Sequence, residues 1–352
     1  MKKIKVVDLF CGIGGLTHGL IKEGLDVIAG IDNDDSCKFG YEYNNKNAKF
    51  ISKDILEVSA NEINHLFGER ERTIRVLAGC APCQPFSKLN QKEITKKQLE
   101  PLGKFAQLID ETQPDIVSME NVSGLANVKK YPIFKTFLDT LEENGYDYKY
   151  EIVNVSEYGV PQNRKRLVLL ASKFGEIALI KRTHKNKKVT VRDVIKRLPP
   201  LKDGEISQDD PLHRSRRLSE KNLLRIKATP HNGGNSRSWN ESLILKCHRK
   251  KSGETYRSTV YGRMRWDEPA PTMTTQCVGL GNGRFGHPEQ DRAISLREAA
   301  LFQTFKKGYK FSDPKAPIIT DHIAKFIGNA VPVRLGVVIG KSIKAHAKEY
   351  AK

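Results

Sequence analysis

The sequence predicts an α/β protein in which a mostly parallel sheet is followed by a smaller, loop-rich domain. Up to about residue 172, short apolar runs rich in β-branched residues alternate with helix-like stretches. This alternation is typical of parallel strands covered by helices on both faces. From Lys181 the chain becomes rich in Lys, Arg, Asn, Gly and Ser, and its periodicity is poor. The length of 352 residues also exceeds the usual size of a single domain.

The individual elements follow from this alternation. We expect strands at 4–10, 27–31, 74–78, 115–119, 148–155 and 166–171. We expect helices at 16–22, 105–111, 133–144, 296–305, 318–327 and 331–343. The last helical stretch would pack back onto the first domain. The predicted domains are therefore a first domain at 1–180, completed by about 310–352, and a second domain at 181–309.

The positive charge is concentrated in one part of the chain. The net charge is +19, and residues 181–260 hold 21 Lys and Arg against 8 Asp and Glu. A scattered excess would indicate only a solvated basic face, whereas a localised excess favours a polyanion such as nucleic acid. An anionic membrane surface would also attract this segment, but the segment lacks the clean amphipathic helix that membrane docking needs.

Hydropathy and cysteine content restrict the location of the protein. No apolar run is evident that approaches the roughly 18 residues needed to cross a bilayer, so we expect no membrane association. Six cysteines in a chain of this length indicate reduced thiols rather than a disulfide framework, as in a cytoplasmic protein.

A glycine-rich turn follows the first expected strand, at 8–15, with the sequence DLFCGIGG. Glycines permit a tight turn and close approach of a ligand to the backbone, and the following helix offers unpaired N–H groups. Asp32 ends the second expected strand, where a carboxylate can accept hydrogen bonds from ribose hydroxyls. The pattern indicates a nucleoside cofactor but does not separate a dinucleotide from S-adenosylmethionine. A tight turn without a ligand is the alternative.

A cysteine between two prolines follows the third expected strand, in the run GCAPCQPFS at 79–87. The prolines stiffen the backbone around Cys83 at the carboxyl edge of the sheet, where open α/β sheets bind ligands. A buried structural thiol would have apolar neighbours instead. A redox pair of Cys80 and Cys83 ranks below a nucleophile, because such pairs usually occur early in a small thioredoxin-like unit. No spacing typical of a metal site is present, so we expect no bound metal.

Charged residues follow the next two strands. Glu120 comes directly after the expected strand at 115–119, at the same sheet edge as Cys83. Arg164 and Arg166 would share one face if their segment is extended, and their guanidinium groups could clamp a base oxygen or phosphates. Alternatively, Glu120 is a carboxylate that caps the next turn, and the two arginines belong to a charged edge strand.

Taken together, these stretches resemble the DNA (cytosine-5) methyltransferase family, of the bacterial modification type. The resemblance covers nearly the whole chain except about 181–258, where members of this family carry their target-recognition region. It implies a Rossmann-like S-adenosylmethionine-dependent methyltransferase domain with a smaller, loop-rich target-recognition domain. Six ordered motifs carry the resemblance: 8–15, 79–87, 120–122, 162–166, 292–305 and 328–332.

The resemblance also implies a mechanism. Cys83 would add to C6 of a cytosine that has flipped out of the duplex, which makes C5 nucleophilic. Glu120 would hold or protonate N3 and bond the amino group, while Arg166, assisted by Arg164, would hold O2. The base that removes the C5 proton is not visible in the sequence.

The family further implies S-adenosyl-L-methionine as the cofactor and double-stranded DNA as the partner. The stretch 84–104, which begins with Gln84, would close over the DNA, and Ser87 would contact a phosphate. A paired restriction endonuclease is expected for a modification enzyme, and the chain would act as a monomer. The residues expected to contact the cofactor are Phe10, Gly12, Gly14, Asp32, Asp54 and Asn329.

Two other functions remain open at this point. A tRNA cytosine-C5 methyltransferase would use the same machinery, but the basic insert argues for duplex DNA instead. A non-catalytic DNA-binding regulator would not need both Cys83 and Glu120.

Overall fold

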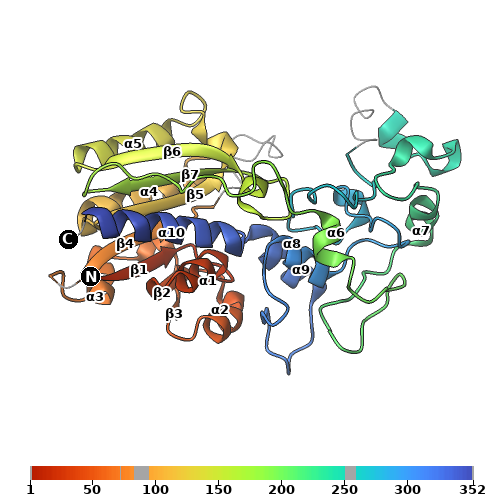
Figure 1. The fold of residues 1–352 in the computed structure, drawn as a ribbon, viewed down its shortest axis with the longest axis horizontal. Coiled ribbons are helices and arrows are strands. Elements are labelled where there is room, and N and C mark those ends of the chain that lie inside the picture. Colours follow the sequence, from red (N-terminus) through yellow and green to blue (C-terminus); the bar gives the residue numbers. More distant parts are fainter. Residues whose placement is uncertain (1, 72, 83–94, 250–258, 351–352) are drawn as a thin grey trace. The chain divides into compact units, whose positions relative to one another are not determined.

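The computed structural model describes residues 2–71, 73–82, 95–249 and 259–350. Within these residues, the strands form one seven-stranded sheet in the order β3-β2-β1-β4-β5-β7-β6 (Figure 1). The strands are β1 Lys3–Leu9, β2 Asp26–Asp32, β3 Lys49–Ser52, β4 Thr73–Gly79, β5 Ile116–Val122, β6 Asp147–Asn154 and β7 Lys165–Ser172.

The sheet is mostly parallel, as the sequence predicts. Strands β3, β2, β1, β4 and β5 pair in parallel with their neighbours. Only β7 runs antiparallel to both of its neighbours, β5 and β6. The carboxyl ends of the parallel strands therefore meet at one edge of the sheet, and β7 begins at that edge.

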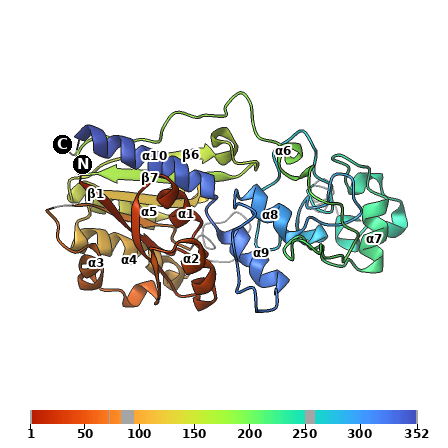
Figure 2. The ribbon, with the colours of Figure 1, turned by 60° about the horizontal axis from the view of Figure 1, so that its bottom comes forward.

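Helices cover both faces of this sheet. Helix α1 packs along α10, and α4 packs against both α3 and α5 on the other face (Figure 2). The side chains of α3, α4 and α5 share one buried apolar cluster with alternate residues of the strands, such as Val7 and Leu9. The helices of this unit are α1 Gly15–Lys22, α2 Lys38–Asn44, α3 Ala60–Phe67, α4 Lys96–Thr112, α5 Pro132–Glu143 and α10 Val333–Tyr350.

Glycines allow α1 and the start of α10 to approach backbone to backbone. A Cβ atom on Gly15 would lie 2.2 Å from the carbonyl oxygen of Val331, and one on Gly19 would lie 2.4 Å from that of Val333. Any side chain at these two positions would push α10 away. The expected packing of the last helix onto the first domain is therefore present, and glycines in α1 permit it.

The contacts of the chain divide it into two compact units. The first unit comprises Met1–Tyr158, Lys165–Arg182 and Ala330–Lys352, and the second comprises Gly159–Arg164 and Thr183–Asn329. This division differs from the predicted domain boundaries because Gly159–Arg164 and all of α9, Thr320–Asn329, belong to the second unit. The role of the second unit in target recognition stays a prediction.

The second unit contains little regular structure and many buried polar side chains. Its other helices are short: α6 Val191–Ile195, α7 Glu220–Lys227 and α8 Leu296–Phe302. Arg263 and Arg292 are both fully buried. Arg263 donates hydrogen bonds to backbone carbonyls such as those of Thr229 and Ile226, at 2.9 and 2.8 Å. Polar contacts of this kind therefore fix loops of this unit in addition to its buried apolar side chains.

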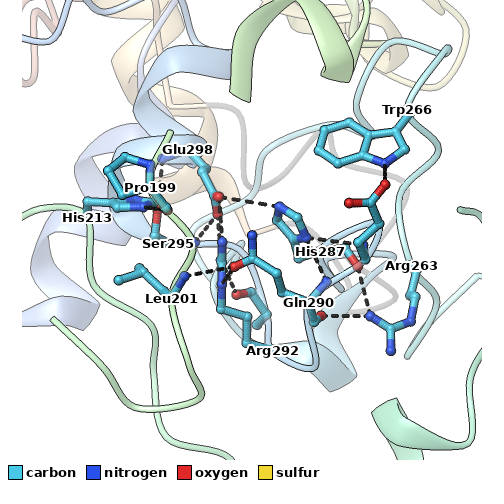
Figure 3. Close-up of polar contacts among 12 residues, drawn as sticks. Pro199, Leu201, His213, Arg263, Trp266, His287, Gln290, Arg292, Ser295 and Glu298 are labelled. Carbon is cyan, nitrogen blue, oxygen red and sulfur yellow. Dashed lines mark hydrogen bonds and ion pairs between the residues drawn. The ribbon is translucent and has the colours of Figure 1, made fainter. Parts of the chain in front are cut away.

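Figure 3 shows a group of these polar contacts. Arg292 makes two hydrogen bonds to the carboxylate of Glu298, at 2.7 and 2.8 Å. Ser295 caps α8 and connects it to His213, whose Nδ1 lies 3.0 Å from Ser295 Oγ. Nδ1 of His287 accepts hydrogen bonds from two backbone N–H groups, so this ring nitrogen carries no proton. Burial lowers the pKa of His287 to about 4, and the ring is therefore neutral at pH 7.

One apolar stretch, Thr320–Tyr350, has the length and hydropathy of a membrane-spanning helix. Inspection of the sequence did not single it out, so the expectation that no apolar run approaches this length was wrong. The stretch contains two separate helices, α9 and α10, and 78% of its most apolar window is buried inside the protein. Its hydropathy therefore reflects burial in protein cores.

Candidate functional site

The glycine-rich turn after β1 has an unusual backbone. Phe10, Gly12 and Gly14 have positive φ angles of 57°, 50° and 88°. Glycine adopts this left-handed conformation at little cost, whereas Phe10 is strained in it. Gly14 forms the N-cap of α1, so the turn presents the start of this helix at the carboxyl edge of the sheet. Strain of this kind is often kept at functional sites.

Asp32 fixes this turn to the end of β2. Its Oδ2 accepts a hydrogen bond from the N–H of Gly12 at 2.8 Å, and its Oδ1 accepts one from the N–H of Asp34 at 2.9 Å. Backbone N–H groups thus orient both oxygens of this carboxylate. The structure thus brings Gly12 and Asp32 together, as a nucleoside site requires.

Asp54 follows β3 at the same edge and is half-buried. Its Oδ1 accepts a hydrogen bond from the N–H of Leu56 at 3.0 Å and caps a short 3₁₀ helix. Its carboxylate is therefore held in one orientation.

A second carboxylate lies underneath the glycine turn. Asp8, in β1, is fully buried and accepts a hydrogen bond of 2.5 Å from Thr17 of α1, whose hydroxyl also lies 3.1 Å from that of Tyr41. Burial raises the pKa of Asp8 to about 7, with a smaller contribution from the nearby charge of Asp32. Sequence reasoning assigned no role to Asp8, although an acid inside an apolar strand was a usable signal.

The loop after β4 begins at the same edge. The N–H of Cys80 donates to the carbonyl of Leu9 at 3.3 Å, and so extends the pairing of β4 with β1. The side chain of Asn121 donates a hydrogen bond of 3.1 Å to the carbonyl oxygen of Ala81. The predicted nucleophile Cys83 and the predicted DNA contacts Gln84 and Ser87 lie outside the described residues.

Glu120 and Arg166 are brought together on β5 and β7. Arg166 Nε lies 3.0 Å from Glu120 Oε1, and the side chains are 12% and 8% exposed. The contact is an ion pair rather than an aligned hydrogen bond. Because both groups are nearly buried, their attraction is weakly screened by solvent. A carboxylate and a guanidinium group therefore lie side by side at the sheet edge.

Arg164 does not share this environment. It belongs to the second unit, is 3% exposed, and donates to the carbonyl oxygens of Met273 at 2.8 Å and Gly328 at 3.1 Å. Gln162 accepts a hydrogen bond from the N–H of Met273 at 2.7 Å and donates one to Gln303 at 2.8 Å. Only Arg166 lies in a strand, so the two arginines do not share one strand face as the sequence suggested.

Asn329 is the last residue of α9 and is exposed. It follows Gly328, whose carbonyl Arg164 holds. Among the described residues, no group of three or more His, Cys, Asp or Glu side chains could hold a metal ion.

Comparisons with known proteins identify the family of the chain. Residues 4–345 match the model of the C-5 cytosine-specific DNA methylase family. The chain is 51% identical to the Type II methylase M.HgiDII of Herpetosiphon aurantiacus over 340 residues, which cover 96% of this chain and 94% of that protein. It is 30% identical to the Type II methyltransferase M.Eco47II of Escherichia coli, with 96% of this chain and 78% of that protein covered.

The fold also matches solved structures at low sequence identity. A protein described as a DNA modification methyltransferase encoded within an E. coli prophage superposes with a TM-score of 0.73 at 21% identity, covering 98% of this chain and 100% of that one. A Spodoptera frugiperda DNMT2 variant superposes with a TM-score of 0.63 at 16% identity, covering 98% and 99%. The chain belongs to the C-5 cytosine-specific DNA methylase family and is a DNA (cytosine-5)-methyltransferase.

Proposed function

We propose that this enzyme transfers a methyl group from S-adenosyl-L-methionine to C5 of a flipped-out cytosine in a specific double-stranded DNA sequence. The observation that carries this proposal is the ion pair of Glu120 and Arg166 at the carboxyl edge of the sheet. The family match and the identity to M.HgiDII favour DNA over tRNA and over a non-catalytic regulator.

The pair of Glu120 and Arg166 matches one edge of cytosine. Along this edge cytosine carries O2 as an acceptor, N3 as an acceptor, and the amino group as a donor. Arg166 would donate to O2, while Glu120 would accept from the amino group and hold a proton at N3. Thymine carries a carbonyl oxygen in place of the amino group, so it would face the carboxylate with an acceptor and would bind poorly.

Cys83 is the proposed nucleophile of the reaction. Its sulfur would add to C6, and the charge that develops on the ring would be stabilised by Glu120 at N3 and Arg166 at O2. C5 would then take the methyl group, and loss of the C5 proton with departure of the sulfur from C6 would restore the aromatic ring. The thiolate is the form of cysteine that can add to C6. A free thiol has a pKa of roughly 8.5 and is therefore mostly protonated at pH 7, so Cys83 must lose its proton before it attacks.

A methyltransferase needs a methyl donor, and the turn after β1 fits a nucleoside donor. Asp32 is oriented by two backbone N–H groups and would accept from the ribose hydroxyls. The open backbone at Gly12 and Gly14 would allow close approach, and Asp54 would accept from the adenine amino group. We assign Phe10 and Asn329 to the same site. When bound, S-adenosyl-L-methionine supplies an electrophilic methyl group on a sulfonium centre.

The enzyme would bind duplex DNA and act beside a partner enzyme in the cell. The second unit would recognise the target through its basic loops, because residues 181–260 contain most of the excess charge. Gln84 and Ser87 would contact the DNA near Cys83, and Arg164 would support O2 recognition through its neighbours. We infer a monomer in the cytoplasm, paired with a restriction endonuclease of the same specificity.

Bisulfite sequencing of DNA from cells that express the enzyme tests the function. We expect protected cytosines within one short sequence, and none in cells that express Cys83→Ala. Methylation assays on tRNA and duplex DNA with purified enzyme provide the second arm. Methyl transfer to tRNA alone would contradict the proposal.

A further inference from the structure

The side chains of Arg265 and Arg284, both in the second unit, contact the same glycine, Gly233. Nη2 of Arg284 donates to the carbonyl oxygens of Gly233 at 2.9 Å and Arg263 at 3.3 Å. The side chain of Arg265 packs over the same glycine, because a Cβ atom on Gly233 would lie 2.4 Å from Arg265 Nε and 2.5 Å from its Cγ. Gly233 has a φ of +107°, so other residues are disfavoured there for conformational reasons as well.

A second glycine completes the surface under Arg284. A Cβ atom on Gly262 would lie 3.2 Å from Arg284 Cγ and 3.3 Å from its Nε. The half-buried side chain of Arg284 is thus held along its length by backbone, whereas most surface arginines move freely. Ordering a long side chain costs conformational entropy, so a fixed arginine is already prepared for a ligand.

The pair carries more positive charge than its surroundings neutralise. Burial lowers the pKa of Arg284, and the neighbouring charge of Arg265 lowers it further. One carboxylate, Glu268, lies 2.8 Å from Arg265 Nη1, and both of these side chains are about half exposed. Like charges at close range destabilise the free protein, and an electron-rich ligand would relieve this repulsion.

Hydrogen-bond donors remain available on Arg284. Within the part of the chain that the structure describes, Nη2 is the nitrogen through which Arg284 bonds the protein, which leaves the N–H groups of Nε and Nη1 without protein acceptors. These groups lie on different edges of the guanidinium plane, so Arg284 can donate to one acceptor of a ligand while Arg265 donates to a second. Guanine presents two acceptors, O6 and N7, in the major groove, and arginine is their commonest protein partner.

We propose that Arg265 and Arg284 form a specificity-determining pair that recognises a guanine in the target sequence. This inference rests on the proposed function, in which the second unit binds the target DNA. Recognition of a base requires a guanidinium group in a fixed place, which Gly233 and Gly262 provide. A phosphate contact requires only positive charge and would not need a guanidinium group held in place by Gly233 and Gly262.

Substitution by lysine separates the two kinds of contact, because lysine keeps the charge but loses the planar fork. The variants are Arg265→Lys and Arg284→Lys. Arg70→Lys serves as the matched control, because exposed Arg70 belongs to the first unit and is ion-paired with Asp115. Each enzyme is assayed by methyl transfer to a library of duplexes in which the flanks of the methylated cytosine are randomised, with sequencing after bisulfite treatment.

For Arg284→Lys we expect kcat/KM on the preferred sequence to fall roughly 10-fold or more, with relaxed preference at one guanine position. Arg265→Lys should relax the same position, and Arg70→Lys should leave the preference unchanged. A uniform loss on all sequences would identify a phosphate contact and overturn the inference, as would an unchanged preference. Absence of DNA methylation by the unsubstituted enzyme would instead contradict the proposed function.

Glu268→Gln keeps the inference testable if the arginine variants fold poorly. This exposed substitution frees Arg265 from its carboxylate, so the Kd of the preferred duplex should fall several-fold while the preference for guanine is retained. An unchanged or weaker affinity would count against the pair as a DNA contact.

Discussion

Arg166 Nε lies 3.0 Å from Glu120 Oε1, and the two residues are held on neighbouring antiparallel strands of the sheet. Strand pairing fixes the distance between the two groups without any ligand. Glu120 also lies one residue from Asn121, which bonds the loop that leads to Cys83. The position of one strand, β5, therefore determines both the carboxylate that we propose to bind the base and the start of the loop that leads to the proposed nucleophile.

Glu120→Gln is the first test of this arrangement. The amide keeps the shape but cannot hold a proton at N3, so we expect kcat to fall by about 10² to 10⁴ while the Kd for duplex DNA changes little. Steady-state kinetics and DNA binding are the measurements. Asp139→Asn, which changes an exposed ion pair with Lys135 on helix α5, is the control and should retain activity. Equal losses in both variants would contradict the assignment.

Asn121→Asp tests whether the side-chain amide positions the nucleophile loop. The substitution is nearly isosteric, but it places a carboxylate oxygen against the carbonyl of Ala81 in place of a donor. We expect a destabilisation of about 1–3 kcal/mol and a lower kcat with an unchanged KM for the methyl donor. Unfolding curves and single-turnover methylation provide the two readouts. A stable variant with full activity would exclude this positioning role.

The buried carboxyl group of Asp8 should make the free energy of unfolding depend on pH. Its pKa is raised to about 7 in the folded protein, so the folded state holds a proton that the unfolded chain loses above its ordinary pKa near 4. The stabilisation of the folded state that comes from this raised pKa is fully present below pH 4 and is lost as the pH rises towards 7.

Asp8→Asn removes this titration. Measured between pH 4 and 7, the stability of the variant relative to the unsubstituted enzyme should rise with pH, by on the order of 3 kcal/mol over the window. Denaturant unfolding at several pH values gives this difference directly. A difference that stays constant with pH would show that Asp8 is ionised in the folded protein.

Glu298→Gln tests the buried ion pair of the second unit. Burial alone would raise the pKa of Glu298, but Arg292 more than offsets this and lowers it to about 2. The stabilisation is therefore present above pH 4.5 and is lost as the pH falls towards 2. The variant leaves a fully buried Arg292 without its charge partner, so we expect a loss of about 3–5 kcal/mol.

The matched control for this prediction is Asp321→Asn, which breaks the exposed ion pair with Arg216. An exposed pair contributes at most about 1 kcal/mol because solvent screens it. Thermal unfolding of both variants should therefore show a much larger effect for Glu298→Gln. Similar shifts would contradict a structural role for the buried pair.

The sequence predicted most of the first unit because its strands bury apolar side chains and glycine marks its first turn. The strand β3, Lys49–Ser52, and helix α3, Ala60–Phe67, were not predicted. The strand is only four residues long, and α3 follows it after a short 3₁₀ helix, so neither gives a long periodic signal. The hydrogen bond between Gly12 and Asp32 depends on β1 and β2 being neighbours in the sheet, a strand order that was not predicted.

Other parts of the site could not be predicted. Arg164 and Arg166 look equivalent in the sequence, yet one holds the carbonyls of Met273 and Gly328 while the other faces Glu120. Which partner each arginine finds depends on contacts between residues far apart in the chain. The same holds for Arg265 and Arg284, which meet on Gly233 through loops without periodicity.

Covalent trapping measures the central reaction most directly. Duplexes with 5-fluorocytosine at the target position should form a complex with the enzyme that survives denaturation once S-adenosyl-L-methionine is added, because fluorine cannot leave C5 as a proton does. Cys83→Ala should form no such complex while still binding the duplex. If the unsubstituted enzyme formed no trapped complex with a 5-fluorocytosine duplex of the sequence that it methylates, attack by Cys83 would be contradicted.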